Sequence, residues 1–178
     1  MTRIFIIGYM GAGKTTLGVR LAEQLALPFI DLDQYIERQQ GKTIAQIFAD
    51  NGEPAFRIIE RDALRQVAEG DSAVIACGGG TPCFYDNIEL MNSRGQVVYI
   101  KPSADVIYAH LQMGGSIRPL LLGKTPEQVM QFIKEQTAAR QPFYSKARYT
   151  LPIPLLDSDE KIKQTTDNIM QTLGMIKH

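Results

Sequence analysis

The chain has 178 residues, of which 44% are hydrophobic and 21% are charged. Nineteen basic residues balance nineteen acidic ones, so no net charge would draw the chain to nucleic acid or to an anionic membrane. Its apolar runs are too short for a membrane span or a signal peptide. These properties predict a single cytoplasmic domain over residues 1–178, and we expect neither nucleic-acid nor membrane partners.

The first predicted element is a strand over residues 4–7, because an unbroken apolar run suits a parallel strand covered on both faces. It leads into Gly8–Thr16, which matches the phosphate-binding pattern G-x-x-x-x-G-K-[ST] at every required position. Leu17, Leu21 and Leu25 then recur every fourth residue and predict a helix. Strand, glycine loop and helix together indicate a nucleoside triphosphate site.

The chemistry of phosphate binding explains the composition of this loop. Glycines let the backbone approach phosphate oxygens closely, and the N-terminus of the next helix adds its positive dipole end. Lys14 is expected to reach the β- and γ-phosphates, and the Thr15 hydroxyl to bind Mg²⁺. The alternative is a glycine-rich turn with a surface lysine. The residues expected to bind the nucleotide are Gly11, Ala12, Gly13, Lys14, Thr15 and Thr16.

Two carboxylates follow the second predicted strand. This short strand begins at Phe29 and ends at Asp31-Leu32-Asp33. Alternation along an extended segment would direct Asp31 and Asp33 to the same side. A helix over residues 34–40 is predicted to follow.

The next long helical pattern ends at Glu69 and contains a stripe of arginines. Arg57, Arg61 and Arg65 lie four residues apart. A solvated basic face with Glu60 and Glu69 as partners accounts for Arg61 and Arg65. Nothing in the spacing sets Arg57 apart.

A third strand is predicted over residues 73–76, and it runs into Gly78, Gly79 and Gly80. Three glycines at the end of a strand are costly to order, so we expect a ligand to approach the backbone closely here. Ligands of open α/β sheets bind at the carboxyl ends of the strands, which favours this hypothesis. The alternative is a loose turn.

The second half of the chain continues to alternate helices and strands. Helices are predicted over residues 84–92, 103–111 and 126–140 and after Ser158, and strands over residues 97–100 and 149–153. The segment of about 112–124 has glycines near both ends and Arg118 between them. We expect a mobile lid that brings positive charge over the phosphates, with a plain surface loop as the alternative.

Helices alternating with five apolar strands predict a three-layer α/β/α sandwich around a five-stranded parallel sheet of the P-loop kind. Right-handed crossovers limit the possible topologies, and the strand order 2-3-1-4-5 is expected by analogy with that fold.

Two absences narrow the class of P-loop protein. The sequence contains no Asn-Lys-x-Asp segment, which GTP-dependent switches need to read guanine. The position at the end of the third strand, where ATPase motors usually carry an acidic residue, holds Cys77 followed by glycines, so Asp31 is the expected carboxylate near Mg²⁺. A small kinase with a small acceptor fits these features best.

The chain resembles the shikimate kinase family nearly from end to end. The phosphate loop alone is generic, but the full set of motifs in this order is specific. The motifs are Gly8–Gly18, Asp31-Leu32-Asp33, Ile47-Phe48, Gly52-Glu53, Phe56-Arg57-x-x-Glu60, Gly78-Gly79-Gly80, Arg118-Pro119-Leu120-Leu121 and Arg140-x-x-x-Tyr144.

The resemblance implies a nucleoside monophosphate kinase-like fold. It also implies transfer of the γ-phosphoryl group of ATP to the 3-hydroxyl of shikimate, giving shikimate 3-phosphate and ADP, in chorismate and aromatic amino acid biosynthesis. ATP, Mg²⁺ and shikimate are thus the expected small-molecule partners, and a monomer is expected. The acceptor-binding region would cover about residues 32–62.

The resemblance also implies roles for individual residues. Asp33 would orient or deprotonate the attacking hydroxyl, and Arg118 would close over the transferring phosphate. Arg57 and Arg140 would bind the shikimate carboxylate through forked guanidinium groups. The implied catalytic residues are Lys14, Asp33 and Arg118, with Arg118 also on the nucleotide; the implied metal ligands are Thr15 and Asp31; the implied substrate-binding residues are Asp33, Arg57, Glu60, Gly78, Gly79, Gly80 and Arg140.

Two departures from the family pattern leave the adenine contacts unassigned. The arginine that often precedes the lid is replaced here by His110-Leu111-Gln112, and no basic residue occurs in the stretch 152–156 after the fifth strand. The alternatives that remain are a gluconate or nucleoside monophosphate kinase, and a catalytically silent ATP-binding module.

Overall fold

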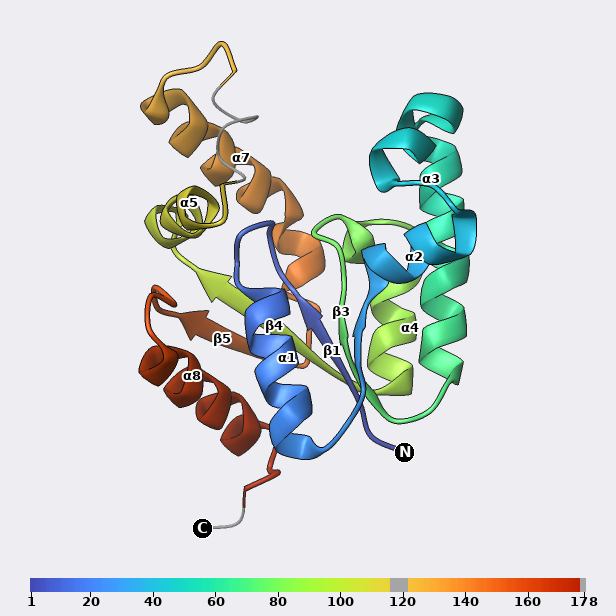
Figure 1. Ribbon diagram of the computed structural model, residues 1–178, viewed down its shortest axis with the longest axis vertical. Coiled ribbons are helices and arrows are strands. Elements are labelled where there is room, and N and C mark those ends of the chain that lie inside the picture. Colours follow the sequence, from blue (N-terminus) through green and yellow to red (C-terminus); the bar gives the residue numbers. More distant parts are fainter. Residues whose placement is uncertain (116–121, 177–178) are drawn as a thin grey trace.

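The computed structural model describes residues 1–115 and 122–176. Its five strands form one parallel sheet in the order β2-β3-β1-β4-β5, which confirms the predicted topology. Since β1 occupies the middle of this order, the loop after β1 leaves from the centre of the sheet's carboxyl edge (Figure 1). The strands are β1 (Arg3–Ile7), β2 (Phe29–Asp31), β3 (Ala73–Ala76), β4 (Gln96–Pro102) and β5 (Tyr149–Ile153).

Helices connect the strands and cover both faces of the sheet. Several begin at a residue whose side chain accepts a hydrogen bond from a backbone N–H in the first turn, among them Thr43, Ser103 and Ser158. The helices are α1 (Lys14–Leu25), α2 (Leu32–Gln40), α3 (Ile44–Glu69), α4 (Asn87–Arg94), α5 (Ala104–Met113), α7 (Pro126–Tyr144) and α8 (Asp159–Thr172), with a 3₁₀ turn η1 (Thr81–Cys83).

The central strand shows how the three layers arise. Its side chains alternate between two cores, and all four named here are fully buried. Ile4 and Ile6 belong to the core shared with α1 and α8, whereas Phe5 and Ile7 belong to the core shared with α2, α3 and α4. The predicted α/β/α sandwich is therefore confirmed.

The boundaries of several elements differ from the predicted ones by a few residues, and three of these differences have a clear local cause. β2 ends at Asp31, whose carboxylate accepts a hydrogen bond from the Gln34 N–H and so starts α2 at Leu32. Asp33 thus lies in the first turn of a helix, and the argument from strand alternation was wrong. α4 begins after residue 86 rather than at 84, because Tyr85 has a left-handed backbone with φ of 51°.

The third difference is that α7 continues past Arg140 to Tyr144, through Pro142. Proline inside a helix removes one backbone hydrogen bond, and the complete burial of Tyr144 holds this last turn against the sheet. The expected partners of the arginine stripe also differ. Arg61 pairs with Asp62, and Arg65 pairs with Asp86, which directly precedes α4.

Within the two described ranges, no helix combines the length and the apolar character needed to cross a membrane.

Candidate active site

The phosphate loop joins β1 to α1 and lies between two groups of helices. Figure 1 shows α5 and α7 on one side of it, and α2 and α3 on the other. Gly11 and Gly13 have φ angles of 75° and 102°, a region of conformational space that glycine enters without penalty. Ala12 is fully buried, whereas Thr15 and Thr16 are exposed in the first turn of α1. The loop therefore presents its backbone and two hydroxyls at a helix N-terminus, as anion binding requires.

Lys14 is half-buried, and its Nζ donates hydrogen bonds to the carbonyl oxygens of Gly8 and Tyr9, at 2.8 and 2.9 Å. Burial lowers the pKa of Lys14 to about 8, and the nearby Asp33 carboxylate opposes this shift. A lysine with a pKa of about 8 remains mostly cationic at pH 7, so it can still attract phosphate.

His110 links the phosphate loop to the segment after β5. Its Nε2 accepts a hydrogen bond from the Leu156 N–H at 2.9 Å, so in the neutral ring its Nδ1 carries the proton and donates to the Gly11 carbonyl at 2.7 Å. The phosphate loop, Met113 and Leu156 line a cavity of about 400 Å³ beside this ring. His110 thus fixes two walls of the cavity nearest to the phosphate loop, a role that sequence reasoning missed.

We expect His110→Phe to raise the KM for ATP by about five- to tenfold, because the Gly11 carbonyl and the Leu156 N–H each lose a hydrogen-bond partner. The KM for the acceptor should stay within about twofold, since the hydrogen bonds of the ring are to the phosphate loop and to the segment after β5. Steady-state kinetics with each substrate varied in turn measures both values. Tyr108→Phe, on the same helix, is the control, and an equal rise in both KM values would contradict the assignment.

The glycine turn after β3 is the point where the predicted acceptor residues meet. A Cβ atom placed on Gly78 would lie 3.1 Å from Asp33 Oδ1, one on Gly79 would lie 2.9 Å from Arg140 Nη1, and one on Gly80 would lie 2.6 Å from Arg57 Nη2. The last two distances are shorter than real Cβ contacts allow, so a side chain at either position would have to push a guanidinium group aside. A ligand is the expected reason for these glycines, and the close packing of the two arginines also favours glycine at two of the three positions.

The same turn also touches the phosphate loop. A Cβ atom on Gly79 would lie 3.4 Å from the backbone nitrogen of Met10 and 3.5 Å from the carbonyl oxygen of Gly8. One carboxylate and two guanidinium groups are therefore grouped directly beside the predicted phosphate site.

Arg57 is held by two carboxylates of unequal burial. Its Nη1 donates to Glu60 Oε1 at 2.8 Å, and Glu60 is only 1% exposed. Its Nε and Nη2 donate to Glu53 Oε1 at 3.3 and 3.2 Å, and the Glu53 side chain is 53% exposed. The guanidinium carbon also lies 4.1 Å from the centre of the Phe84 ring. Arg57 is thus fixed in place on one side, and on the other side has a partner that a substrate carboxylate could displace.

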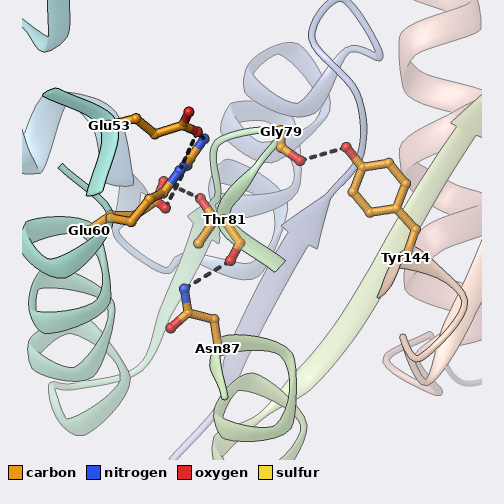
Figure 2. Close-up of polar contacts among 7 residues, drawn as sticks. Glu53, Glu60, Gly79, Thr81, Asn87 and Tyr144 are labelled. Atoms are coloured by element: carbon orange, nitrogen blue, oxygen red, sulfur yellow. Dashed lines mark hydrogen bonds and ion pairs between the residues drawn. The ribbon is translucent and has the colours of Figure 1, made fainter. Parts of the chain in front are cut away.

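Arg140 and Tyr144 lie one turn apart on α7 and contact the same glycine. The Tyr144 hydroxyl donates to the Gly79 carbonyl at 2.6 Å (Figure 2), and its ring packs 4.9 Å from that of Tyr99. Sequence reasoning did not assign Tyr144 a role. Its spacing of four residues from Arg140 was the available signal, because such residues share one face of a helix.

Asp33 lies among other acidic groups. Burial raises its pKa to about 6, and the carboxylates of Asp31 and Glu60 add to the shift, while Lys14 opposes it. The carboxylate is therefore mostly ionised at pH 7, at a cost in folding free energy that an exposed aspartate would not have.

Thr15 and Asp31 were predicted as metal ligands. Asp31 uses one oxygen to cap α2, and its charge raises the pKa values of both Lys14 and Asp33. Among the described residues, no group of three or more His, Cys, Asp or Glu side chains could enclose a metal ion. Arg118, predicted to act from a lid over 112–124, lies outside the described residues.

Comparison with known proteins places the chain in a family. The shikimate kinase family model matches residues 10–174. The chain belongs to the shikimate kinase family. A shikimate kinase from Phocaeicola vulgatus is 45% identical over 98% of this chain and 99% of that protein. The sequence-based prediction of a kinase of the shikimate kinase family is confirmed.

Solved structures of shikimate kinases agree with the fold. One from Bacteroides thetaiotaomicron matches with a TM-score of 0.92 at 43% identity, covering 97% of this chain and 98% of that one. One from Acinetobacter baumannii, in complex with shikimate, matches with a TM-score of 0.82 at 33% identity, covering 97% and 93%. A gluconokinase from Sinorhizobium meliloti matches at 16% identity with a TM-score of 0.54, which shows a shared fold only.

Proposed function

We propose that this chain is an ATP-dependent shikimate kinase, which transfers the γ-phosphoryl group of ATP to the 3-hydroxyl of shikimate. The observation that carries the proposal is the convergence of Asp33, Arg57 and Arg140 on three consecutive glycines beside the phosphate loop. This grouping suits a small acceptor with a carboxylate at one end and a hydroxyl at the other. Membership of the shikimate kinase family supports the same acceptor.

Phosphoryl transfer requires alignment and charge neutralisation more than covalent chemistry from the protein. Arg57 and Arg140 bind the acceptor carboxylate, and this directs the hydroxyl toward Asp33. The hydroxyl oxygen forms a bond to the γ-phosphorus as the bond to the β–γ bridging oxygen breaks, and ADP leaves with that oxygen. Asp33, ionised above about pH 6, takes the hydroxyl proton, while Lys14 neutralises charge on the phosphates.

The residues at the loop also fit Mg²⁺. This ion usually keeps several waters and binds one or two protein oxygens together with substrate phosphates. The exposed Thr15 hydroxyl and the carboxylate oxygen of Asp31 that does not cap α2 could supply those oxygens. When bound, Mg²⁺ neutralises negative charge on the phosphates.

The remaining parts of the proposal rest on sequence. Arg118 would stabilise charge on the transferring phosphoryl group, from a lid over about 112–124, and residues 32–62 would form the acceptor region. We further propose a cytoplasmic monomer with one domain, in accord with the balanced charge of the chain.

An assay of ADP release tests the function. With ATP, Mg²⁺ and shikimate, we expect turnover that falls to background when Mg²⁺ is chelated, because the phosphate charge is then no longer neutralised. Gluconate and AMP serve as alternative acceptors, and neither should support release above the rate without acceptor. Faster ADP release with gluconate or AMP than with shikimate would contradict the proposal that shikimate is the acceptor. ATP binding without ADP release on any acceptor would indicate a silent ATP-binding module.

A further inference from the structure

Glu60 is a buried carboxylate with a separate donor for each of its oxygens. Its Oε1 accepts from Arg57 Nη1 at 2.8 Å, and its Oε2 accepts from the hydroxyl of Thr81, also at 2.8 Å (Figure 2). Thr81 belongs to η1, directly after the glycine turn. The hydroxyl therefore connects the acidic partner of Arg57 to the turn on which the acceptor residues converge.

Thr81 is itself held firmly. It is fully buried, its carbonyl accepts from Asn87 Nδ2 at 2.9 Å, and its N–H donates to the Gly78 carbonyl at 3.1 Å. In Figure 2, Glu60 lies beside the hydroxyl of Thr81, and Asn87 lies below Thr81 at its carbonyl. Because its N–H and its carbonyl are both hydrogen-bonded, the Thr81 backbone holds the hydroxyl in position to donate to one oxygen of Glu60.

We propose that Thr81 is a positioning residue for acceptor binding, which acts through Glu60 on Arg57. A carboxylate and a guanidinium prefer to pair through two parallel hydrogen bonds. Because Thr81 occupies Oε2, Glu60 contacts Arg57 through Oε1 alone. The Nε and Nη2 edge of Arg57 is left to the exposed Glu53, at distances above 3 Å, and a substrate carboxylate can take over that edge.

This inference rests on the proposed function, because it assumes that Arg57 binds the acceptor carboxylate. Without the hydroxyl, Glu60 is free to rotate and to pair with Arg57 through both oxygens. The buried carboxylate would then compete with the acceptor for Nη2 of the same guanidinium group. Acceptor affinity should fall, while nucleotide affinity should not change.

The test compares Thr81→Ser with Thr81→Ala, since both lack the methyl group and only the second lacks the hydroxyl. We expect Thr81→Ala to raise the KM for shikimate about tenfold, with kcat and the KM for ATP within about twofold of wild type. Thr81→Ser should restore the KM for shikimate. Thr81→Val, which keeps the side-chain volume, should behave like Thr81→Ala.

Thr166→Val is the matched control for loss of a buried hydroxyl. Thr166 is also fully buried, and its hydroxyl donates to the Ile162 carbonyl at 2.8 Å within α8. If Thr81 acts through Arg57, Thr166→Val should leave the shikimate KM within about twofold of wild type, although its melting temperature should fall by an amount similar to that in Thr81→Val. A rise in the shikimate KM in Thr166→Val equal to that in Thr81→Ala would overturn the positioning role.

The Arg57→Lys background separates the two proposals. If Thr81 acts through Arg57, adding Thr81→Ala to Arg57→Lys should raise the shikimate KM by less than twofold more. If Arg57→Lys alone raises that KM and Thr81→Ala alone does not, the positioning role is wrong and the function stands. If Arg57→Lys alone has no effect on it, the carboxylate assignment on which both proposals depend is wrong.

Discussion

Asp33→Asn is expected to abolish most of the kinase activity and, in the same protein, to stabilise the fold. Asparagine keeps the size of the side chain but cannot accept the hydroxyl proton, so kcat should fall by about 10²–10⁴-fold. A coupled assay of ADP release at pH 8 measures this loss. Asp31 is not expected to replace Asp33 as the base, because one of its oxygens caps α2 and the other is the one proposed to bind Mg²⁺.

The gain in stability follows from the direction of the pKa shift. The pKa of Asp33 is raised from 3.8 to about 6 in the folded protein, so the ionised carboxylate destabilises the fold fully above about pH 6, and this penalty disappears as the pH falls below about 4. After allowance for partial solvent screening, Asp33→Asn should add about 1–2 kcal/mol to the free energy of unfolding at pH 8. Urea unfolding at pH 8 and pH 4 measures the difference.

Asp71→Asn, at an exposed site away from the glycine turn, controls for the general effect of removing one negative charge. It should leave the pH dependence of unfolding as in wild type. Two results would show that ionised Asp33 does not destabilise the folded protein. One is a lower free energy of unfolding for Asp33→Asn than for wild type at pH 8, and the other is an increase in that free energy that is the same at both pH values.

Arg57→Lys is expected to weaken shikimate binding by on the order of 10²-fold, while ATP binding changes by less than about twofold. Lysine keeps the positive charge and can still pair with Glu60. It has no planar fork, so it cannot hold Glu60 and a substrate carboxylate at the same time. Calorimetric titration of each ligand measures the two affinities.

Arg61→Lys is the control for this variant, because Arg61 lies one turn further along α3, pairs with the neighbouring Asp62 and stacks 5.1 Å from the Tyr85 ring. It should bind both ligands as wild type does. Equal weakening of shikimate and ATP binding by Arg57→Lys would rule out a specific carboxylate contact.

The sequence was sufficient for the features that depend on local pattern. The apolar run before Gly8 and the leucine stripe after Thr16 predicted β1 and α1, because each signal lies within a few residues of the element it describes. The strand order came from fold analogy, and the sheet confirms it. Asp33 was placed by a wrong local argument, since the cap formed by Asp31 starts α2 one residue after the strand.

Contacts between distant segments could not be predicted in this way. Thr81 meets Glu60 across 21 residues, Tyr144 meets Gly79 across 65, and His110 meets Gly11 across 99. Such pairs depend on how helices pack against the sheet, and no short spacing records that packing. Only the resemblance to a family distinguished the role of Arg57 from that of Arg61, because the two arginines occupy equivalent positions on the stripe.

The glycine turn restricts how this kinase could be altered to accept other substrates. Even a single methyl group on Gly79 or Gly80 would collide with an arginine guanidinium, so enlarging the turn would displace the groups that hold the acceptor. Engineering of a new acceptor range must therefore begin on α2, α3 or α7, where side chains can be exchanged, and leave the backbone of the turn untouched.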